Sequence, residues 1–179
     1  MARLARKMPP PSVSRKALLV GGSDLAFRGV VDDLVRLSAR LQAVRGGLAA
    51  KIGVTPPQYN IVMFLARHAP PGGLRLGRVA EALDVSLSFI VAEVRRLRRK
   101  RLVVVRRDPS DGRATLASLS MSGERALELA APVMRRVNDR LFAALSRAEL
   151  LELGRLAAAL HADSAAALDQ LDDDRPAGK

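Results

Sequence analysis

The sequence predicts a mainly α-helical fold that carries one small β-hairpin. Hydrophobic residues make up 49% of the 179 residues but aromatic residues only 3%, so the core must be built from Leu, Val and Ala. A core of this kind favours helices over a β-sandwich. Apolar side chains recur at helical spacing along most of the chain, and one β-prone run with a turn at its centre, residues 102–119, stands apart.

The longest helical pattern spans residues 24–50. Its apolar residues are spaced alternately by three and four positions, as in a heptad seam: Phe27, Val30, Leu34, Leu37, Leu41, Val44 and Leu48. Ser23 is placed to cap the first turn. A seam this long and narrow packs either within its own chain or against a helix of a second copy.

Two shorter helices follow. Thr55 is a good N-cap and Pro56 a good first helical residue, which predicts a helix over 56–68 that stops at the sequence APPGG. A short helix is expected near 76–83.

A further helix begins after its N-cap, Ser86, and buries Ile90, Val94 and Leu97. The opposite side carries Ser88, Ala92, Arg95 and Arg99, with Val91 and Arg96 beside them. The helix also holds one acid, Glu93, nearer the core edge. Two helices joined by a tight turn, the second with a basic outer face, predict a helix-turn-helix. A membrane-surface helix is the other interpretation, but the apolar stripe is only wide enough for core packing.

Residues 102–119 predict a β-hairpin with strands at 102–107 and 113–119 around the turn sequence DPSDG, in which Gly112 is able to take a positive φ. A hairpin directly after a basic helix is a wing, and arginines at its tip suit the negative potential of a DNA minor groove. Asp108 and Asp111 are expected to hold Arg106, Arg107 or Arg113 by bidentate pairing. A solvated charged hairpin is the alternative.

Two more helices are expected at the C-terminal end. Ser120 or Ser122 caps the first, over about 121–145, and Pro132 predicts a kink in it. The sequence SRAE at 146–149 is a capping box that starts the last helix, which ends near 171. An acidic tail, 172–179, closes the chain.

The charge of the chain is unevenly distributed. The net charge is +12, and residues 1–107 hold 21 Lys and Arg against 6 Asp and Glu, whereas residues 108–179 hold 9 against 12. A local excess of positive charge favours a nucleic-acid surface over general solubility. Residues 1–23 are interpreted as a basic N-terminal arm, with a transit peptide as the alternative.

Several functional classes are excluded by what the sequence lacks. Without cysteine, disulfides, thiolate metal sites and thiol redox sensing are ruled out. His68 and His161 lie far apart, so no metal site is expected. No catalytic pattern or phosphate loop occurs, so the protein is predicted not to be an enzyme and to need no cofactor. No apolar run is long enough to span a membrane, and a cytoplasmic location is expected.

The order of these elements, with the motifs GVTPPQYNIVMFLA and RRDPSDGRATLASLSMSG, resembles the MarR family of winged-helix transcription regulators over residues 24–170. The resemblance implies an obligate homodimer in which terminal helices form the interface and each chain presents a winged helix to a DNA half-site. It also implies a repressor that a small phenolic or aromatic carboxylate ligand releases from DNA.

The sequence departs from the family pattern at defined places. Arg101 stands where the family usually has Gly before the wing, and Leu119–Ser120 replaces the commoner Leu-Thr. The arm lies outside the pattern, and the sensing cysteine of one branch is missing.

The predicted organisation follows from these elements: a basic arm at 1–23, a helical dimerisation region at 24–50 and 121–171, and a winged helix-turn-helix lobe at 51–120. We expect double-stranded DNA with a pseudo-palindromic operator as the partner. The predicted DNA-binding residues are Ser86, Ser88, Val91, Ala92, Arg95, Arg96, Arg99, Arg106, Arg107, Asp111 and Arg113. The predicted ligand-binding residues are Arg40, Tyr59 and Met63. A basic helical nucleoid- or RNA-binding protein without a small-molecule ligand is the alternative function.

Overall fold

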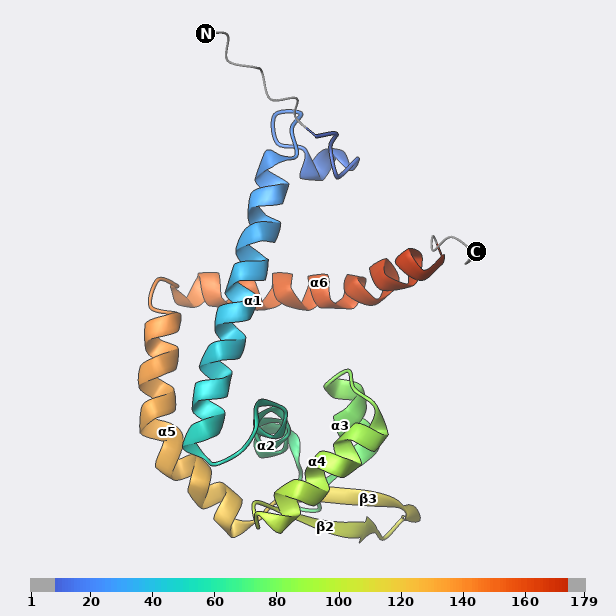
Figure 1. Ribbon diagram of the computed structural model, residues 1–179, viewed down its shortest axis with the longest axis vertical. Coiled ribbons are helices and arrows are strands. Elements are labelled where there is room, and N and C mark those ends of the chain that lie inside the picture. The colour runs from blue at the N-terminus through green and yellow to red at the C-terminus, as the bar shows by residue number, and fades with distance from the viewer. Residues whose placement is uncertain (1–8, 174–179) are drawn as a thin grey trace. The chain divides into compact units, whose positions relative to one another are not determined.

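The computed structural model describes residues 9–173 (Figure 1). Helices predominate, and the sheet formed by these residues is small, antiparallel and three-stranded. The predicted fold class, mainly α with a β-hairpin wing, is confirmed. The chain divides into two compact units within helix α5 (Met121–Leu141), after Met134.

Helix α1 (Leu25–Lys51) matches the predicted first helix, but its N-cap is Asp24 and not Ser23. Asp24 Oδ2 accepts hydrogen bonds from the backbone N and the Oγ of Ser12, at 2.7 and 2.8 Å, and from Arg28 Nε at 2.8 Å. The bond from the Ser12 backbone is the largest of the causes that lower the pKa of Asp24 to about 2. Ser23 only accepts a longer bond from the backbone N of Leu25, at 3.3 Å.

Part of the predicted basic arm is therefore folded against the start of α1. It contains a short 3-10 helix, η1 (Lys16–Leu18), and Arg28 donates a hydrogen bond to the carbonyl oxygen of Pro10 at 2.8 Å. Residues 1–8 of the arm and residues 174–179 of the acidic tail lie outside the described residues.

Helix α2 (Pro56–His68) has the predicted bounds and a complete capping box between Thr55 and Gln58. The short helix α3 (Leu76–Ala82) and the basic helix α4 (Leu87–Arg99) follow as predicted. The N-cap of α4 is Ser86, whose Oγ accepts a hydrogen bond from the backbone N of Phe89 at 3.2 Å. These caps satisfy backbone donors that the first turn leaves unpaired.

The core of the first unit is aliphatic, as the composition requires. Its most completely buried side chains are Ile61, Leu65, Ile90, Leu97, Val62, Val79 and Val103. They come from α2, α3, α4 and the first strand of the hairpin, so the core holds the helix-turn-helix and the wing together.

The sheet contains a strand that the sequence did not predict. The hairpin consists of β2 (Val103–Asp108) and β3 (Asp111–Leu119), and β1 (Leu74–Arg75) pairs with the other edge of β3, in the order β1-β3-β2. A two-residue strand has no periodicity to detect, and it forms only because β3 supplies its partner. Its consequence is to bring Arg75 beside the wing.

The turn of the hairpin differs from the prediction. Pro109 and Ser110 connect the strands, whereas Gly112 lies inside β3 and is not among the glycines with positive φ. Arg107 faces Thr115 but Asp108 faces Asp111, so three β3 residues, 112–114, have no partners on β2. This bulge, and not a left-handed glycine, accommodates Arg113.

Helix α5 begins after Ser120, whose Oγ accepts a hydrogen bond from the backbone N of Gly123 at 3.0 Å. The helix continues through Pro132, which lies in its interior. In the second unit, α6 (Arg147–Asp173) starts at the predicted capping box: Ser146 N donates to Glu149 Oε2 at 2.8 Å, and Glu149 N donates to Ser146 Oγ at 3.3 Å.

Candidate nucleic-acid interface

Helix α4 presents a basic outer face, and its burial pattern follows the sequence prediction. Ile90, Val94 and Leu97 are at most 3% exposed. The exposed predicted contact residues are Ser86, Ser88, Val91, Ala92, Arg95, Arg96 and Arg99. Ser86 is already used as the N-cap, so its hydroxyl supports the helix start.

The end of α4 is fixed by an unusual backbone conformation. Arg101 has φ 61°, in the left-handed region that favours glycine. Its carbonyl oxygen accepts a hydrogen bond from Ser120 Oγ at 2.5 Å. A Cβ on Gly123 would lie 2.2 Å from the carbonyl oxygen of Leu102, so α5 begins in direct contact with this turn. Arg101, which stands where the family usually has Gly, therefore keeps the tight turn but strains the backbone at this residue.

The wing is held by Arg75, and the predicted pairing of Asp108 and Asp111 with the wing's own arginines is wrong. Arg75 Nε donates to Asp108 Oδ2 at 2.7 Å, and Arg75 Nη1 lies 3.8 Å from Asp111 Oδ2. Ser110 donates two more hydrogen bonds to Asp108 Oδ1. The bonds from Ser110 contribute most to the lowering of the Asp108 pKa to about 2, and Arg75 lowers it further.

The missed partner was not recognisable from the local sequence. Arg75 is 33 residues before Asp108, and only the pairing of β1 with β3 brings the two together. Asp111 also has a local role, because its Oδ1 accepts a hydrogen bond from the backbone N of Arg113 at 3.1 Å.

The three wing arginines have different surroundings. Arg106 Nε donates to the carbonyl oxygen of Gly72 at 2.7 Å, so this side chain ties the wing to the loop before β1. Arg107 and Arg113 are exposed, and within residues 9–173 no carboxylate pairs with either of them. Arg113 also lines a cavity of about 370 Å³ that includes Arg78 of α3 and Leu87 and Val91 of α4. The structure therefore brings the wing cation next to the start of the basic helix.

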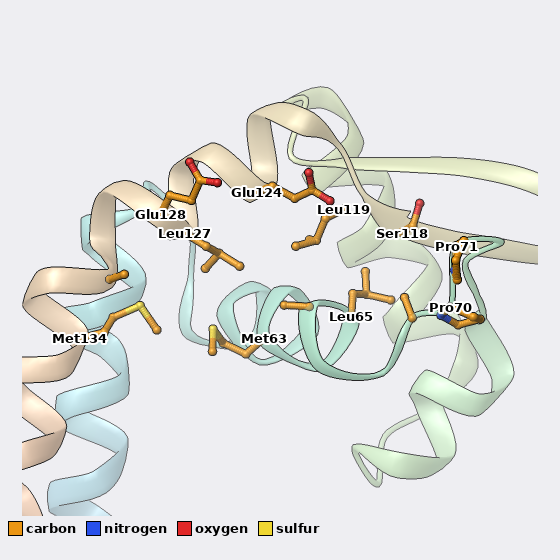
Figure 2. A pocket seen from close by; sticks show the side chains of 13 residues that line it. Met63, Leu65, Pro70, Pro71, Ser118, Leu119, Glu124, Leu127, Glu128 and Met134 are labelled. Atoms are coloured by element: carbon orange, nitrogen blue, oxygen red, sulfur yellow. The ribbon is translucent and has the colours of Figure 1, made fainter.

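A second cavity, of about 650 Å³, lies between α2, the end of β3 and α5 (Figure 2). Its apolar lining includes Met63, Leu65, Leu127 and Met134, and Leu127 points into it. Its polar lining consists of Ser118, Glu124 and Glu128. None of the described residues that line it is basic.

Of the three predicted ligand-binding residues, only Met63 lines this cavity. Tyr59 is 3% exposed, and the Arg45 guanidinium lies 5.4 Å from the centre of the Tyr59 ring. Burial raises the pKa of the Tyr59 hydroxyl. Arg40 is exposed on α1. The cavity residues from α5 were missed because their helical spacing is equally typical of core packing.

Within 9–173, no group of three His, Asp or Glu side chains is arranged to hold a metal ion. No helix in that part of the chain is long and apolar enough to cross a membrane.

A helix-turn-helix whose exposed face is basic, followed by a cationic wing, defines a winged-helix DNA-binding protein. Comparison with known proteins agrees with this class. Residues 52–114 match the model of the MarR family. The HTH-type transcriptional repressor MdtR of Bacillus subtilis is 27% identical over 110 residues, which cover 62% of this chain and 69% of MdtR.

Solved structures give the same assignment. The transcriptional repressor CouR bound to a 23-mer DNA duplex is 26% identical, with a TM-score of 0.61, covering 72% of this chain and 89% of CouR. The regulator PcaV from Streptomyces coelicolor, in complex with its natural ligand, is 29% identical, with a TM-score of 0.57, covering 72% of this chain and 91% of PcaV. The regulator SlyA, at 13% identity and a TM-score of 0.62, shares the fold.

The chain is therefore similar to regulators of the MarR family, in sequence over residues 52–114 and in fold over most of its length. The similar proteins MdtR, CouR and PcaV are regulators or repressors of transcription.

Proposed function

We propose that the protein is a homodimeric, sequence-specific DNA-binding repressor. The observation that carries the proposal is the exposed basic face of α4 beside a wing with two exposed arginines, Arg107 and Arg113, that pair with no carboxylate of residues 9–173. The α4 face would enter the major groove, and Arg113 would enter the adjacent minor groove. The DNA-bound structure of CouR supports this arrangement by similarity.

Most of the predicted contact residues are kept as contacts in the proposal, and three change role. Ser86 caps helix α4. Arg106 supports the wing by its hydrogen bond to the carbonyl oxygen of Gly72. Asp111 supports it by accepting a hydrogen bond from the backbone N of Arg113. Direct contacts are assigned to Ser88, Val91, Ala92, Arg95, Arg96, Arg99, Arg107 and Arg113.

The dimer is supported by apolar side chains that the chain leaves exposed. On α1, Val30, Leu34 and Leu37 of the predicted seam are 58%, 42% and 40% exposed. On α6, large apolar side chains are exposed along the whole helix: Leu150, Leu151, Leu153, Leu156, Leu160, Leu168 and Leu171. Exposed apolar area of this extent is typical of a surface that a second copy covers.

Selection of bound duplexes by the purified protein, followed by footprinting, tests the DNA-binding function. The expected result is a pseudo-palindrome with two half-sites about one helical turn apart. Binding of unrelated duplexes or of RNA with equal affinity would instead favour the alternative of a nucleoid- or RNA-binding protein.

We infer that a small aromatic molecule bound in the α2–β3–α5 cavity regulates DNA binding. The cavity has the volume of a small-molecule site. The predicted aromatic carboxylate lacks a cationic partner in the lining, whose charged side chains are Glu124 and Glu128. The lining therefore favours a neutral phenol or an aromatic cation over a carboxylate.

Three probes that share a benzene ring separate these ligand classes: phenol, benzylammonium and benzoate. Release of the selected duplex by phenol or benzylammonium, and not by benzoate, is the expected result. Release by benzoate alone would show that a cationic side chain from outside this lining, such as Arg40 of a second copy, pairs with the carboxylate. That result would reject the inference about this lining.

A further inference from the structure

Glu93 is the one acid of helix α4, and its side chain is buried in a helix whose outer face is basic. The residue is 5% exposed. A buried carboxylate is costly unless its oxygens are hydrogen-bonded. Both oxygens have partners here: Oε2 accepts a hydrogen bond from Gln58 Nε2 at 2.9 Å, and Oε1 pairs with the guanidinium of Arg96.

Gln58 is itself fixed by the start of α2. It is 2% exposed, and its Oε1 accepts a hydrogen bond from the backbone N of Thr55 at 3.3 Å. Because the amide oxygen faces Thr55, the amide nitrogen faces Glu93. A rigid series of groups thus runs from the α2 capping box through Glu93 to Arg96 on the DNA side of α4.

Arg96 differs in this respect from the other arginines of its helix. The side chains of Arg95, Arg98 and Arg99 are exposed and form no ion pair within the described part of the chain. The side chain of Arg96 is 54% exposed, so its remaining N–H groups face solvent while Glu93 holds one end. An arginine held in this way loses less rotamer freedom on binding and presents its donors in one direction.

We propose that Glu93 is a positioning residue that makes Arg96 a specificity determinant. Glu93 and Gln58 hold the Arg96 guanidinium so that its free N–H groups donate to the edge of a guanine in the major groove, the base that arginine recognises best. The proposal rests on the proposed function, in which α4 enters that groove. Since Glu93 also places a negative charge near DNA, it raises selectivity and not general affinity.

The variant Glu93→Gln tests this role with little change in shape. The new amide oxygen still accepts a bond from Gln58 Nε2, but the ion pair with Arg96 is lost. We expect affinity for the selected duplex to fall by about tenfold, as for one good base contact. Affinity for an unrelated duplex should stay the same or rise, because the protein loses one negative charge near the DNA.

Glu152→Gln is the matched control. It makes the same charge change at an exposed ion pair on α6, where Arg155 Nη2 lies 2.6 Å from Glu152 Oε1. This control should change both affinities by the same factor, so that the ratio between the selected and the unrelated duplex stays at the wild-type value.

A double-mutant cycle with Arg96→Ala shows whether Glu93 acts through Arg96. In the Arg96→Ala background, Glu93→Gln should cause no further loss of the ratio. A wild-type ratio in Glu93→Gln, or losses that multiply in the double variant, would overturn the proposal. If wild type prefers no duplex at all, the proposed function fails, and this inference fails with it.

Arg96→Lys keeps the test decisive if Glu93→Gln does not fold. Lysine keeps the positive charge for phosphate contacts but cannot donate two fixed hydrogen bonds to guanine. The ratio should again fall about tenfold with affinity for the unrelated duplex unchanged, and an unchanged ratio would contradict the proposal.

Discussion

Arg101 ends helix α4 in a conformation that suits glycine, with φ 61°. A left-handed backbone conformation costs roughly 1–2 kcal/mol for a residue with a Cβ. Glycine avoids this cost, but it loses more conformational entropy on folding, which offsets part of the stabilisation. Arg101→Gly is therefore expected to raise the free energy of unfolding by about 1 kcal/mol, measured by urea denaturation. Arg101→Ala is the control, because it removes the same charge but keeps the Cβ; equal stability of the two variants would reject the strain.

Arg113 is the wing residue that we propose to enter the minor groove. It is exposed and lies in the bulge of β3, and no carboxylate among residues 9–173 forms an ion pair with it. Arg113→Ala should weaken operator binding by about 1–3 kcal/mol, with the largest loss where the flanking DNA is rich in A·T pairs. Titration of labelled duplexes at about 0.15 M salt measures the loss, and wild-type affinity in an intact dimer would contradict it.

At the scale of elements, the wing is attached to the helix-turn-helix by Arg75, Asp108 and Ser110. The folded-state pKa of Asp108, about 2, lies below its ordinary value of 3.8. The ionised form is thus favoured by folding, and its stabilising effect is complete above about pH 4 and lost as the pH falls toward 2. Thermal unfolding at stepped pH should show a steeper fall in Tm for wild type than for Asp108→Asn across this window. Parallel curves for the two proteins would exclude the linkage.

The junction between the wing and α5 depends on close backbone contact. Since a Cβ at Gly123 would lie 2.2 Å from the carbonyl oxygen of Leu102, Gly123→Ala must displace the start of α5 or the turn at Arg101. We expect a loss of about 1–3 kcal/mol in unfolding free energy, as for overpacking. Gly77→Ala serves as the comparison, because a Cβ there meets nothing within 4 Å. A Gly123→Ala variant as stable as wild type would show that the two elements separate at low cost.

At the scale of the whole molecule, the proposed dimer explains why α1 and α6 leave so much apolar surface exposed. Leu37→Glu places a charge in the seam and is expected to abolish the dimer and, with it, stable folding, because such dimers often have no stable monomer. Sedimentation and circular dichroism measure both effects. A well-folded wild-type monomer would contradict the proposal.

The net charge of +12 makes a second prediction at this scale. With about eight phosphates contacted per dimer, the logarithm of the binding constant should fall with the logarithm of salt concentration at a slope near −7. Titrations at four or more salt concentrations give the slope, and a value shallower than about −2 is incompatible with the basic face described above.

The sequence by itself determined the elements whose signals are local. Thr55, Ser86 and the SRAE box fixed helix starts through side-chain caps, and Ile90, Val94 and Leu97 fixed the orientation of α4 through their spacing. Caps and helical periodicity act within one or two turns, so they can be read without a fold.

Only the tertiary structure decided the pairings between residues far apart in the chain. Arg75 reaches Asp108 because a two-residue strand adds to β3, and Gln58 reaches Glu93 because α2 packs on α4. The conformation of Arg101 likewise depends on Ser120, which is 19 residues later. The strength of such contacts is set by distance and burial in the folded chain, and neither quantity is encoded in the spacing of the residues that make them.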